Sequence, residues 1–246
     1  MIERFDIGKG SSRLVIHNGV AYFTGHASPK FKTLREQTAG LCRRYDELFA
    51  QFGLKKENII SMNAYLKDIK ELPEFDDEWN KWIDPAHAPA GVAVQAPPDQ
   101  TSEMGDNIHV ELALIVAADC KDQKTTGKLE HFDLSPGGSR LVIHNDVAYF
   151  TGHVSPFFKT LREQTEGICR RYDELFTQFG LKKENILMAN IYVRDGSQMK
   201  EFSEPFHEWV GEINPPAGIA VQAPPEFKFD DGSDILIEIA LIVARA

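Results

Sequence analysis

Two glutamates stand inside otherwise apolar segments of the sequence. Glu111 lies in "VELALIVA" and Glu238 lies in "IEIALIVA", and both segments have the composition of a strand that is buried on both faces. A carboxylate in such a place must be paired, lie at an interface, or carry a raised pKa. General acid–base catalysis is one use for a group of this kind, and an interfacial ion pair is another. These two glutamates are the first candidates for chemistry.

Histidines and arginines form a second group of candidates. His26 and His153 each follow Thr-Gly, and an imidazole there could donate or accept a proton near neutral pH. A hydrogen-bonded histidine at the end of a strand is the alternative interpretation. Arg13 and Arg140 could bind a substrate carboxylate, or they could be surface arginines at a sheet edge.

Most signatures of other catalytic classes are missing from the sequence. There is no Walker loop, HExxH, CxxC or GxSxG motif, and the eight histidines show no spacing typical of metal ligands. Cys42 and Cys169 lie in predicted helices away from any designated base, so we interpret them as buried structural thiols. The sequence therefore predicts no metal site.

The chain is a tandem duplication. Shifting the sequence by 127 positions aligns it with itself without a gap, so that Glu111 falls on Glu238, and about 60% of residues 5–116 recur. We predict one domain over residues 1–118, a polar linker over 119–130, and a second domain over 131–246.

Each copy carries the signals of an α+β domain. Asn18-Gly19 predicts a hairpin over 14–24, with Leu14 and Phe23 on its core face. A helix is predicted to begin after Thr33, in a capping box with Glu36, and to end at Gly53. Further periodicity predicts a strand over 59–66, a helix carrying Leu72, Phe75, Trp79 and Trp82, and two last strands over 90–96 and 108–117.

The predicted order is β-β-α-β-α-β-β, with both helices on one side of a sheet. The other face of that sheet would be uncovered in a single copy. We therefore expect the domains to associate.

Composition narrows the possible partners. The 246 residues carry a formal net charge of −10, which disfavours nucleic acid because no basic patch is available for phosphates. No apolar run approaches the length of a membrane span, and no apolar segment of a signal peptide is present near the start. Three cysteines without paired spacing indicate a reducing compartment, so we expect a cytoplasmic protein.

The order of the repeated motifs resembles a known family. "VAYFTGH", a helix with "EQT", "PAGVAVQA" and "VELALIVA" follow one another as in the Rid family, also called the YjgF or L-PSP family. The resemblance covers both copies and implies a chorismate-mutase-like fold, homotrimers, and ligand clefts between neighbouring domains. It also implies hydrolysis of 2-imino or enamine acids to 2-oxo acids and ammonia, without a metal or organic cofactor.

The resemblance also implies roles for particular residues. A glutamate at the position of Glu111 and Glu238 orients the attacking water, and a Ser-Gly-Gln segment lends backbone contacts. An arginine after Pro-Ala binds the substrate carboxylate in a bidentate pair. Here that arginine is replaced by Gly91 in the first copy and by Gly218 in the second. The backbone segment has become Thr24-Gly25-His26 and Thr151-Gly152-His153.

Two functions remain open from the sequence. The first is a hydrolase of altered specificity, in which Glu111 and Glu238 position water and the histidines or Arg13 and Arg140 supply a further polar group. The second is a non-catalytic ligand-binding or scaffold protein on the same trimeric assembly. Ribonuclease activity or inhibition of translation, which some family labels suggest, is disfavoured by the negative charge.

Overall fold

The structure is a computed structural model that describes residues 2–7, 12–96, 108–118, 129–212, 214–224, 228–229 and 231–245. Cys120 and most of the predicted linker, residues 119–128, lie outside the described residues. The chain divides into two compact units, Met1–Asn145 and Asp146–Ala246. None of the helices in the described part combines the length and the apolar composition that a bilayer crossing needs.

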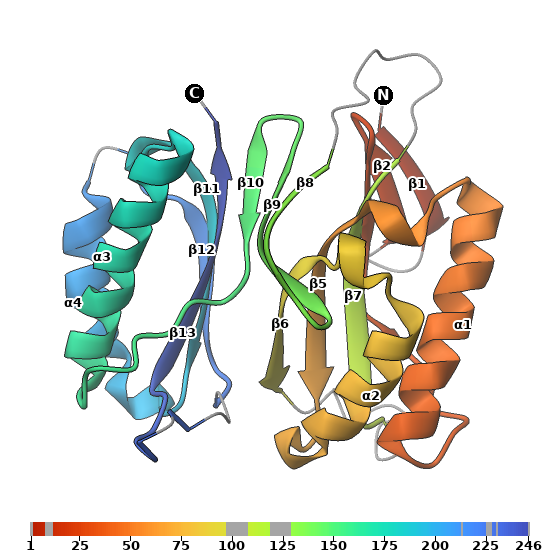
Figure 1. Cartoon of the computed structure of the whole chain (residues 1–246), viewed down its shortest axis with the longest axis horizontal. Coiled ribbons are helices and arrows are strands. Elements are labelled where there is room, and N and C mark those ends of the chain that lie inside the picture. Colours follow the sequence, from red (N-terminus) through yellow and green to blue (C-terminus); the bar gives the residue numbers. More distant parts are fainter. Residues whose placement is uncertain are drawn as a thin grey trace. The chain divides into compact units, whose positions relative to one another are not determined.

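The first copy forms one sheet with two long helices on one face (Figure 1). Its elements are β1 (Ile2–Ile7), β2 (Ser12–His17), β3 (Val20–Phe23), β4 (His26–Ala27), α1 (Leu34–Phe52), β5 (Ile59–Leu66), α2 (Leu72–Trp82), β6 (Ala90–Gln95) and β7 (Val110–Ala117). The strand order is β1-β2-β3-β7-β5-β6, with β4 on β7. The β5–β6 pair is parallel, and the other pairs are antiparallel.

The second copy repeats this arrangement (Figure 1). Its elements are β8 (Glu130–Ser135), β9 (Gly138–His144), β10 (Val147–Phe150), α3 (Leu161–Phe179), β11 (Ile186–Val193), α4 (Met199–Val210), β12 (Ala217–Gln222) and β13 (Ile237–Ala244), in the order β12-β11-β13-β10-β9-β8. Short 3₁₀ helices lie at Lys56–Asn58, Ile69–Glu71, Pro85–His87, Lys183–Asn185 and Gly196–Gln198. The predicted α+β class is confirmed.

Local signals place the hairpin and the first helix where the sequence predicts them. Asn18 and Gly19 have φ of 47° and 74°, as the tight turn requires, and His17 pairs with Val20. Thr33 and Glu36 form the capping box of α1, and Gly53 ends this helix with φ 67°.

The second hairpin turn carries strain that the first avoids. Asp146, with φ 59°, replaces the glycine that stands at position 19. We expect Asp146→Gly to raise the free energy of unfolding by up to about 1 kcal/mol, because a left-handed backbone penalises a side chain. Urea unfolding measures this. The mirror variant, Gly19→Asp, should lower stability by a similar amount, and equal midpoints for both variants and the natural chain would contradict the assignment.

Three strands were not predicted from the sequence, namely the two-residue strand β4 and the edge strands β1 and β8. β1 and its repeat β8 are edge strands whose side chains are mostly exposed, so they lack the apolar alternation of a half-buried strand. Asp6 and Asp133 also interrupt them with φ of 48° and 50°. The order per copy therefore begins with one more strand than predicted.

The core of the first copy lies between α1, α2 and one face of the sheet. Leu14, Phe23, Leu112 and Leu114 are buried in it, while Tyr45 donates a hydrogen bond of 2.7 Å to the carbonyl of Leu112. Because side chains alternate along a strand, the residues between these point to the face without helices. That second face carries the first candidate for chemistry.

Candidate functional site

Glu111 lies on the face of its sheet that the helices do not cover. Its neighbour Leu112 is fully buried on the helix side, and Glu111 itself is only partly buried and pairs in register with Tyr65 on β5. Glu238 repeats this placement, in register with Tyr192 on β11. Each copy therefore presents one glutamate beside one tyrosine on its helix-free face.

The two carboxylates stand apart from other charges. Within the described residues, neither Glu111 nor Glu238 makes an ion pair or a hydrogen bond through its side chain. Burial raises the pKa of Glu111 and raises that of Glu238 to about 7. A carboxylic acid with a pKa near 7 exchanges its proton at neutral pH, as a general acid or base must.

A glycine makes room for each carboxylate. A Cβ built on Gly25 would lie 1.8 Å from Oε1 of Glu111, and one on Gly152 would lie 1.7 Å from Oε1 of Glu238. No side chain fits at either position unless the carboxylate moves. The Thr-Gly segment therefore fixes the place of the glutamate, which gives the glycine of that segment a steric role.

This contact predicts that a larger residue displaces the carboxylate without a loss of fold. In Gly25→Ala/Gly152→Ala the new methyl groups should push the flexible glutamate side chains aside, because neither glycine needs a left-handed backbone. A displacement of about 1 Å can lower turnover about 100-fold. If the carboxylates act on a bound substrate, steady-state turnover and thermal unfolding measure the two effects separately. Full turnover with both alanines present would contradict the steric role.

The two histidines lie on the opposite face of the sheet from the two glutamates. His26 is 5% exposed and pairs with Leu112, so it lies on the helix side, opposite to Glu111. Its ring packs edge-on against Tyr45, at 5.3 Å between centroids, and burial lowers its pKa to about 4. His153 is similarly buried, 4.8 Å from the ring of Tyr172. The histidines are core residues, and no acid–base pair with the glutamates forms within one copy.

The two arginines and Thr24 lie at exposed positions, whereas Thr151 is half-buried. Arg140 is about half exposed and forms an ion pair of 3.5 Å with Asp133. Arg13 is exposed, and its carbonyl accepts a hydrogen bond from the backbone N–H of Thr24. Since Leu14 points into the core, the adjacent Arg13 points to the face that also carries Glu111. Thr151 accepts a 3.0 Å hydrogen bond at its carbonyl from Nδ1 of His153.

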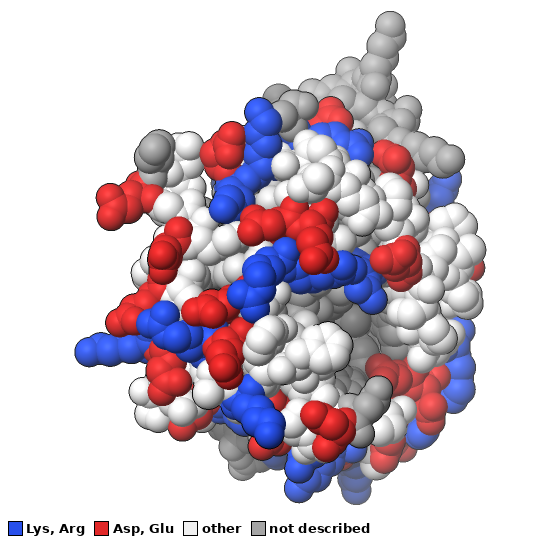
Figure 2. Space-filling view, turned by 60° about the vertical axis from the view of Figure 1, so that its left-hand side comes forward, with Lys and Arg blue, Asp and Glu red and all other residues white. Residues whose placement is uncertain are grey.

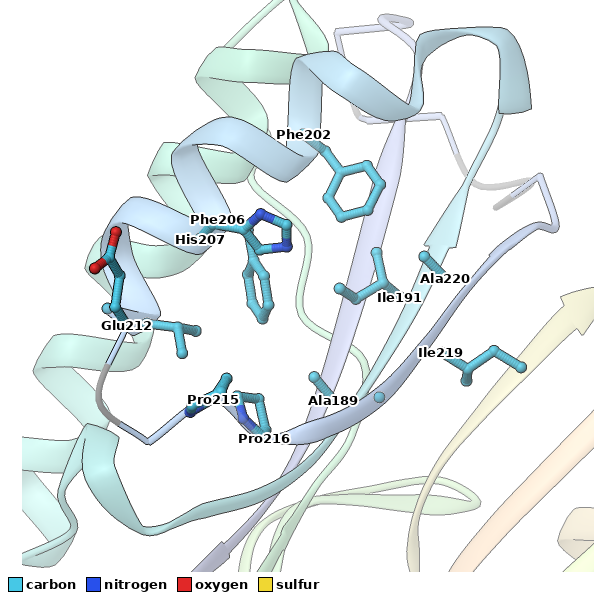
Figure 3. A pocket seen from close by; sticks show the side chains of 13 residues that line it. Ala189, Ile191, Phe202, Phe206, His207, Glu212, Pro215, Pro216, Ile219 and Ala220 are labelled. Atoms are coloured by element: carbon cyan, nitrogen blue, oxygen red, sulfur yellow. The ribbon is translucent and has the colours of Figure 1, made fainter.

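The glycines that replace the arginine lie on the opposite side of the sheet. Gly218 borders a cavity of about 550 Å³ between β12 and α4, together with Ala189, Phe202 and Phe206 (Figure 3). The presence of the α4 side chains in this lining identifies the helix side. Gly91 has the same register in the first copy, where it pairs with the core residue Met62.

It follows that one copy of the domain cannot place both the position of Gly218 and the carboxylate of Glu238 around one ligand. Gly218 faces the helices, whereas Glu238 shares the helix-free face with Tyr192. A site that combines the position after Pro-Ala with a catalytic-type glutamate must therefore draw these residues from two copies of the domain.

The glycines also pack too closely for an arginine without adjustment. A Cβ on Gly91 would lie 2.3 Å from the carbonyl oxygen of Met62, and one on Gly218 would lie 2.9 Å from that of Ala189. Both neighbours are backbone atoms of the adjacent strand. A larger side chain at Gly218 would therefore require less movement of the neighbouring backbone than one at Gly91.

Sequence reasoning missed Tyr65 and Tyr192. Each lies directly across the ladder from a glutamate, within the range where cross-strand side chains touch. The signal was available, because "NAYL" and "NIYV" keep the tyrosine at the same place in both copies. The phenols are candidates for positioning the carboxylates.

The two described thiols are buried, as the sequence predicts. Cys42 and Cys169 are buried, and burial raises the pKa of each to about 12, so neither is a nucleophile at neutral pH. Within the described residues no group of three or more potential ligands could hold a metal ion.

Charges of both signs are intermixed over the surface in Figure 2, where Lys and Arg alternate with Asp and Glu. Ion pairs also join opposite charges across α1 and α2, such as Arg35 with Asp77 and Glu78, both at 2.8 Å. This face offers no continuous basic surface for a phosphate backbone.

Comparisons with known proteins identify the family. The family model described as Endoribonuclease L-PSP matches residues 2–118 and again residues 137–245. The chain belongs to the L-PSP family. A RutC family protein of Haemophilus influenzae is 33% identical over 112 residues, which are 44% of this chain and 90% of that protein. RutC family protein YoaB of Escherichia coli is 28% identical over a region that covers 47% of this chain and 97% of the length of YoaB. A relative of this kind therefore corresponds to one copy of the duplicated L-PSP chain.

A solved structure of a chorismatase is similar over nearly the whole L-PSP chain. The aligned region covers 94% of this chain and 79% of the chorismatase chain, with a TM-score of 0.63 and 13% sequence identity. At this identity the likeness shows the fold alone. The resemblance to the YjgF or L-PSP family and the tandem arrangement are confirmed.

Proposed function

We propose that this L-PSP protein is a hydrolase of small imines, enamines or related carbonyl compounds, in which Glu111 and Glu238 activate water. One observation carries the proposal: both carboxylates are partly buried, lack an ionic partner within the described residues, and are seated against a glycine. An unpaired carboxylate in such surroundings costs stability, so its retention in both copies supports a chemical use.

The proposed reaction needs no group beyond the carboxylate and water. The glutamate accepts a proton from water while the oxygen bonds to the imine carbon, and returns this proton to the imine nitrogen, which gives a neutral carbinolamine. The carboxylate then takes the proton of the new hydroxyl group and delivers it to the amino group as the C–N bond breaks, so that the products are a carbonyl compound and ammonia. A pKa of about 7 at Glu238 suits both transfers, and the proposal includes no metal or organic cofactor.

Substrate selection must differ from that of family members with the arginine. Gly91 and Gly218 offer no side chain to a carboxylate. Arg13, which faces the same side as Glu111, could bind an acidic group from another direction, while Arg140 is engaged with Asp133. Thr24, Gly25, Thr151 and Gly152 would supply backbone contacts beside the carboxylates.

The proposed working form is a homotrimer, in which residues 1–118 and 131–246 act as six domains joined by the 119–130 linkers. The need for two copies around one site supports it. Gel filtration with light scattering should give the mass of three chains, and a monomer would contradict it. A reducing compartment such as the cytoplasm is proposed from the three cysteines.

The alternative is a non-catalytic binding or scaffold protein on the same assembly. The specific observation in its favour is the loss of the arginine in both copies, so that neither half restores the carboxylate anchor. A protein of this kind would bind a small molecule in the clefts and release it unchanged.

Ammonia release from a freshly generated 2-imino acid distinguishes the hydrolase from the non-catalytic binding protein. The natural chain is compared with Gly218→Arg, which places a guanidinium where the backbone leaves most room, and with Gly218→Ala, which controls for the added Cβ. Activity of the natural chain supports the hydrolase, and activity of Gly218→Arg alone supports a hydrolase retuned away from acids. If all three proteins are inactive while a small molecule still binds, the result contradicts the hydrolase and supports the non-catalytic binding protein.

A further inference from the structure

The first copy has a small cavity between α1 and the segment that follows β4, which we call the α1 cavity. Its volume is about 310 Å³, and its lining comes from within residues 27–31 and 40–47. Lys30, Arg43 and Arg44 contribute three positive charges to this lining, and Glu47 contributes one negative charge. The α1 cavity is therefore positively charged, although the whole chain has a net charge of −10.

The three cations of the α1 cavity lack an acidic partner. Among the residues that the structure describes, none of Lys30, Arg43 and Arg44 forms an ion pair. Lys30 and Arg43 lie instead over the ring of Phe31, with its centroid 5.2 Å from Nζ and 5.6 Å from Cζ. Nε of Arg44 is buried and has no hydrogen-bond acceptor. Because like charges repel one another, an anion bound in this cavity would stabilise the arrangement.

A buried hydroxyl group in the same lining also favours a ligand. Ser28 is 8% exposed, and its hydroxyl makes no hydrogen bond in the described part of the chain. Gly40 makes room for this hydroxyl, since a Cβ built on Gly40 would lie 2.8 Å from Oγ of Ser28. A buried hydroxyl without a partner costs free energy, and a ligand that accepts its hydrogen bond removes that cost.

The second copy lacks two of these features. Phe157, which is 89% exposed, stands at the position that Lys30 has in the first copy. Arg171 forms an ion pair of 2.9 Å with Glu174, whereas its counterpart Arg44 forms no ion pair with a described residue. The cluster of three cations without an acidic partner is therefore specific to the first copy.

We propose that the α1 cavity binds a phosphate group, either as the free ion or as the monoester of a small molecule. Three positive charges and one negative charge leave two positive charges in the lining, which match the charge of about −1.5 to −2 on a phosphate monoester near neutral pH. Arginine binds phosphate through a planar fork of N–H donors, and lysine binds it as a point charge. The hydroxyl of Ser28 supplies a further donor.

The size of the α1 cavity restricts the ligand to a small molecule. A volume of about 310 Å³ lies at the lower end of the range of about 300–1,000 Å³ for small-molecule sites. A nucleic acid needs a continuous basic surface, which three cations around one cavity do not provide. The lining includes neither Glu111 nor Glu238, so this proposal does not depend on the proposed hydrolysis.

Titration with inorganic phosphate, followed by NMR, tests the proposal with the second copy as an internal control. In TROSY spectra of the natural chain, the amide signals of Ser28, Gly40 and Arg43 should shift and saturate, while those of Ser155 and Gly167 should stay in place. Sodium acetate at the same ionic strength controls for charge screening and should cause no comparable shifts. Equal shifts in the two copies, or shifts that do not saturate, would overturn the proposal.

Matched variants test the contribution of the cations. Arg44→Gln should weaken the affinity for inorganic phosphate at least about tenfold, because charge-assisted hydrogen bonds are lost. Arg171→Gln makes the same change in the second copy and should leave the affinity as it is in the natural chain. Lys30→Phe introduces the residue that the second copy carries at this position, and it should also weaken binding. Circular dichroism verifies folding, and natural affinity in either folded variant of the first copy would contradict the proposed site.

Phenyl phosphate distinguishes the two sources of the phosphate group. If it shifts the signals of Ser28 and Gly40 at least as strongly as inorganic phosphate does, the cavity accepts a monoester. If inorganic phosphate binds and phenyl phosphate does not, the ligand is the free ion. Both results support a phosphate site in the α1 cavity, and a failure of both compounds to bind would overturn it.

Discussion

Glu238→Gln should make the folded chain more stable at pH 8. Burial raises the pKa of Glu238 from an ordinary value of 4.5 to about 7, so the folded state holds a proton that the unfolded state has lost between these pH values. The free energy of unfolding of the natural chain therefore falls as pH rises from about 4.5 to about 7 and stays level above that. Gln carries no charge and avoids the loss, which amounts to about 3 kcal/mol.

Urea unfolding at pH 5 and pH 8 measures this effect. The difference between Glu238→Gln and the natural chain should be small at pH 5 and full at pH 8. Glu111→Gln should shift the urea midpoint at pH 8 in the same direction, since burial also raises the pKa of Glu111. Coincident urea midpoints for the natural chain and Glu238→Gln at pH 8 would show that the carboxylate is solvated like an ordinary glutamate.

The second large effect concerns turnover and pH. In a Glu111→Gln chain only the site of Glu238 remains, and a general base works only when ionised. Hydrolysis should then rise about tenfold for each pH unit well below about 7 and level off above it, a gain of about 50-fold between pH 5 and pH 7. The rate of the reaction without protein is subtracted at each pH. A flat profile from pH 5 to 7 would contradict the assignment of Glu238 as the base.

Local chemistry made much of the fold predictable. The turn at Asn18-Gly19 and the capping box of Thr33 and Glu36 depend on neighbours within a few residues, so the sequence displays them. Strand β5 (Ile59–Leu66) coincides with its prediction because apolar residues alternate along it. The edge strands β1 and β8 were not predicted, since an exposed strand has no apolar face to display.

The candidate site was predictable only in part. Glu111 was predicted because it is an acidic residue in an apolar strand. The contact between Gly25 and Glu111 was not predicted, because these residues are more than eighty positions apart in the sequence. His26 was a reasonable partner by residue type, yet its strand position turns it into the core. The division of Gly91 and Glu111 between opposite faces depends on the register of three strands, which no local signal gives.

The duplication makes each copy a control for the other. Gly25 and Gly152 hold their glutamates in the same way, which indicates that this contact survived the divergence of the two halves. The region from α2 to β6 differs most, with Trp79 replaced by Phe206 and Asp84 by Gly211. The half that lost these groups is also the half in which Ile219 and Leu187 are exposed.

The most direct test of the central claim is ammonia release from a freshly generated 2-imino acid by three matched proteins. These are the natural chain, Glu111→Gln/Glu238→Gln, and Arg35→Gln as a control for altered charge on the distant helix surface. Water activation by the two carboxylates predicts that the double variant loses about 100- to 10,000-fold in turnover while the control keeps the natural rate. Equal turnover by the natural chain and the double variant would show that Glu111 and Glu238 do not carry the reaction.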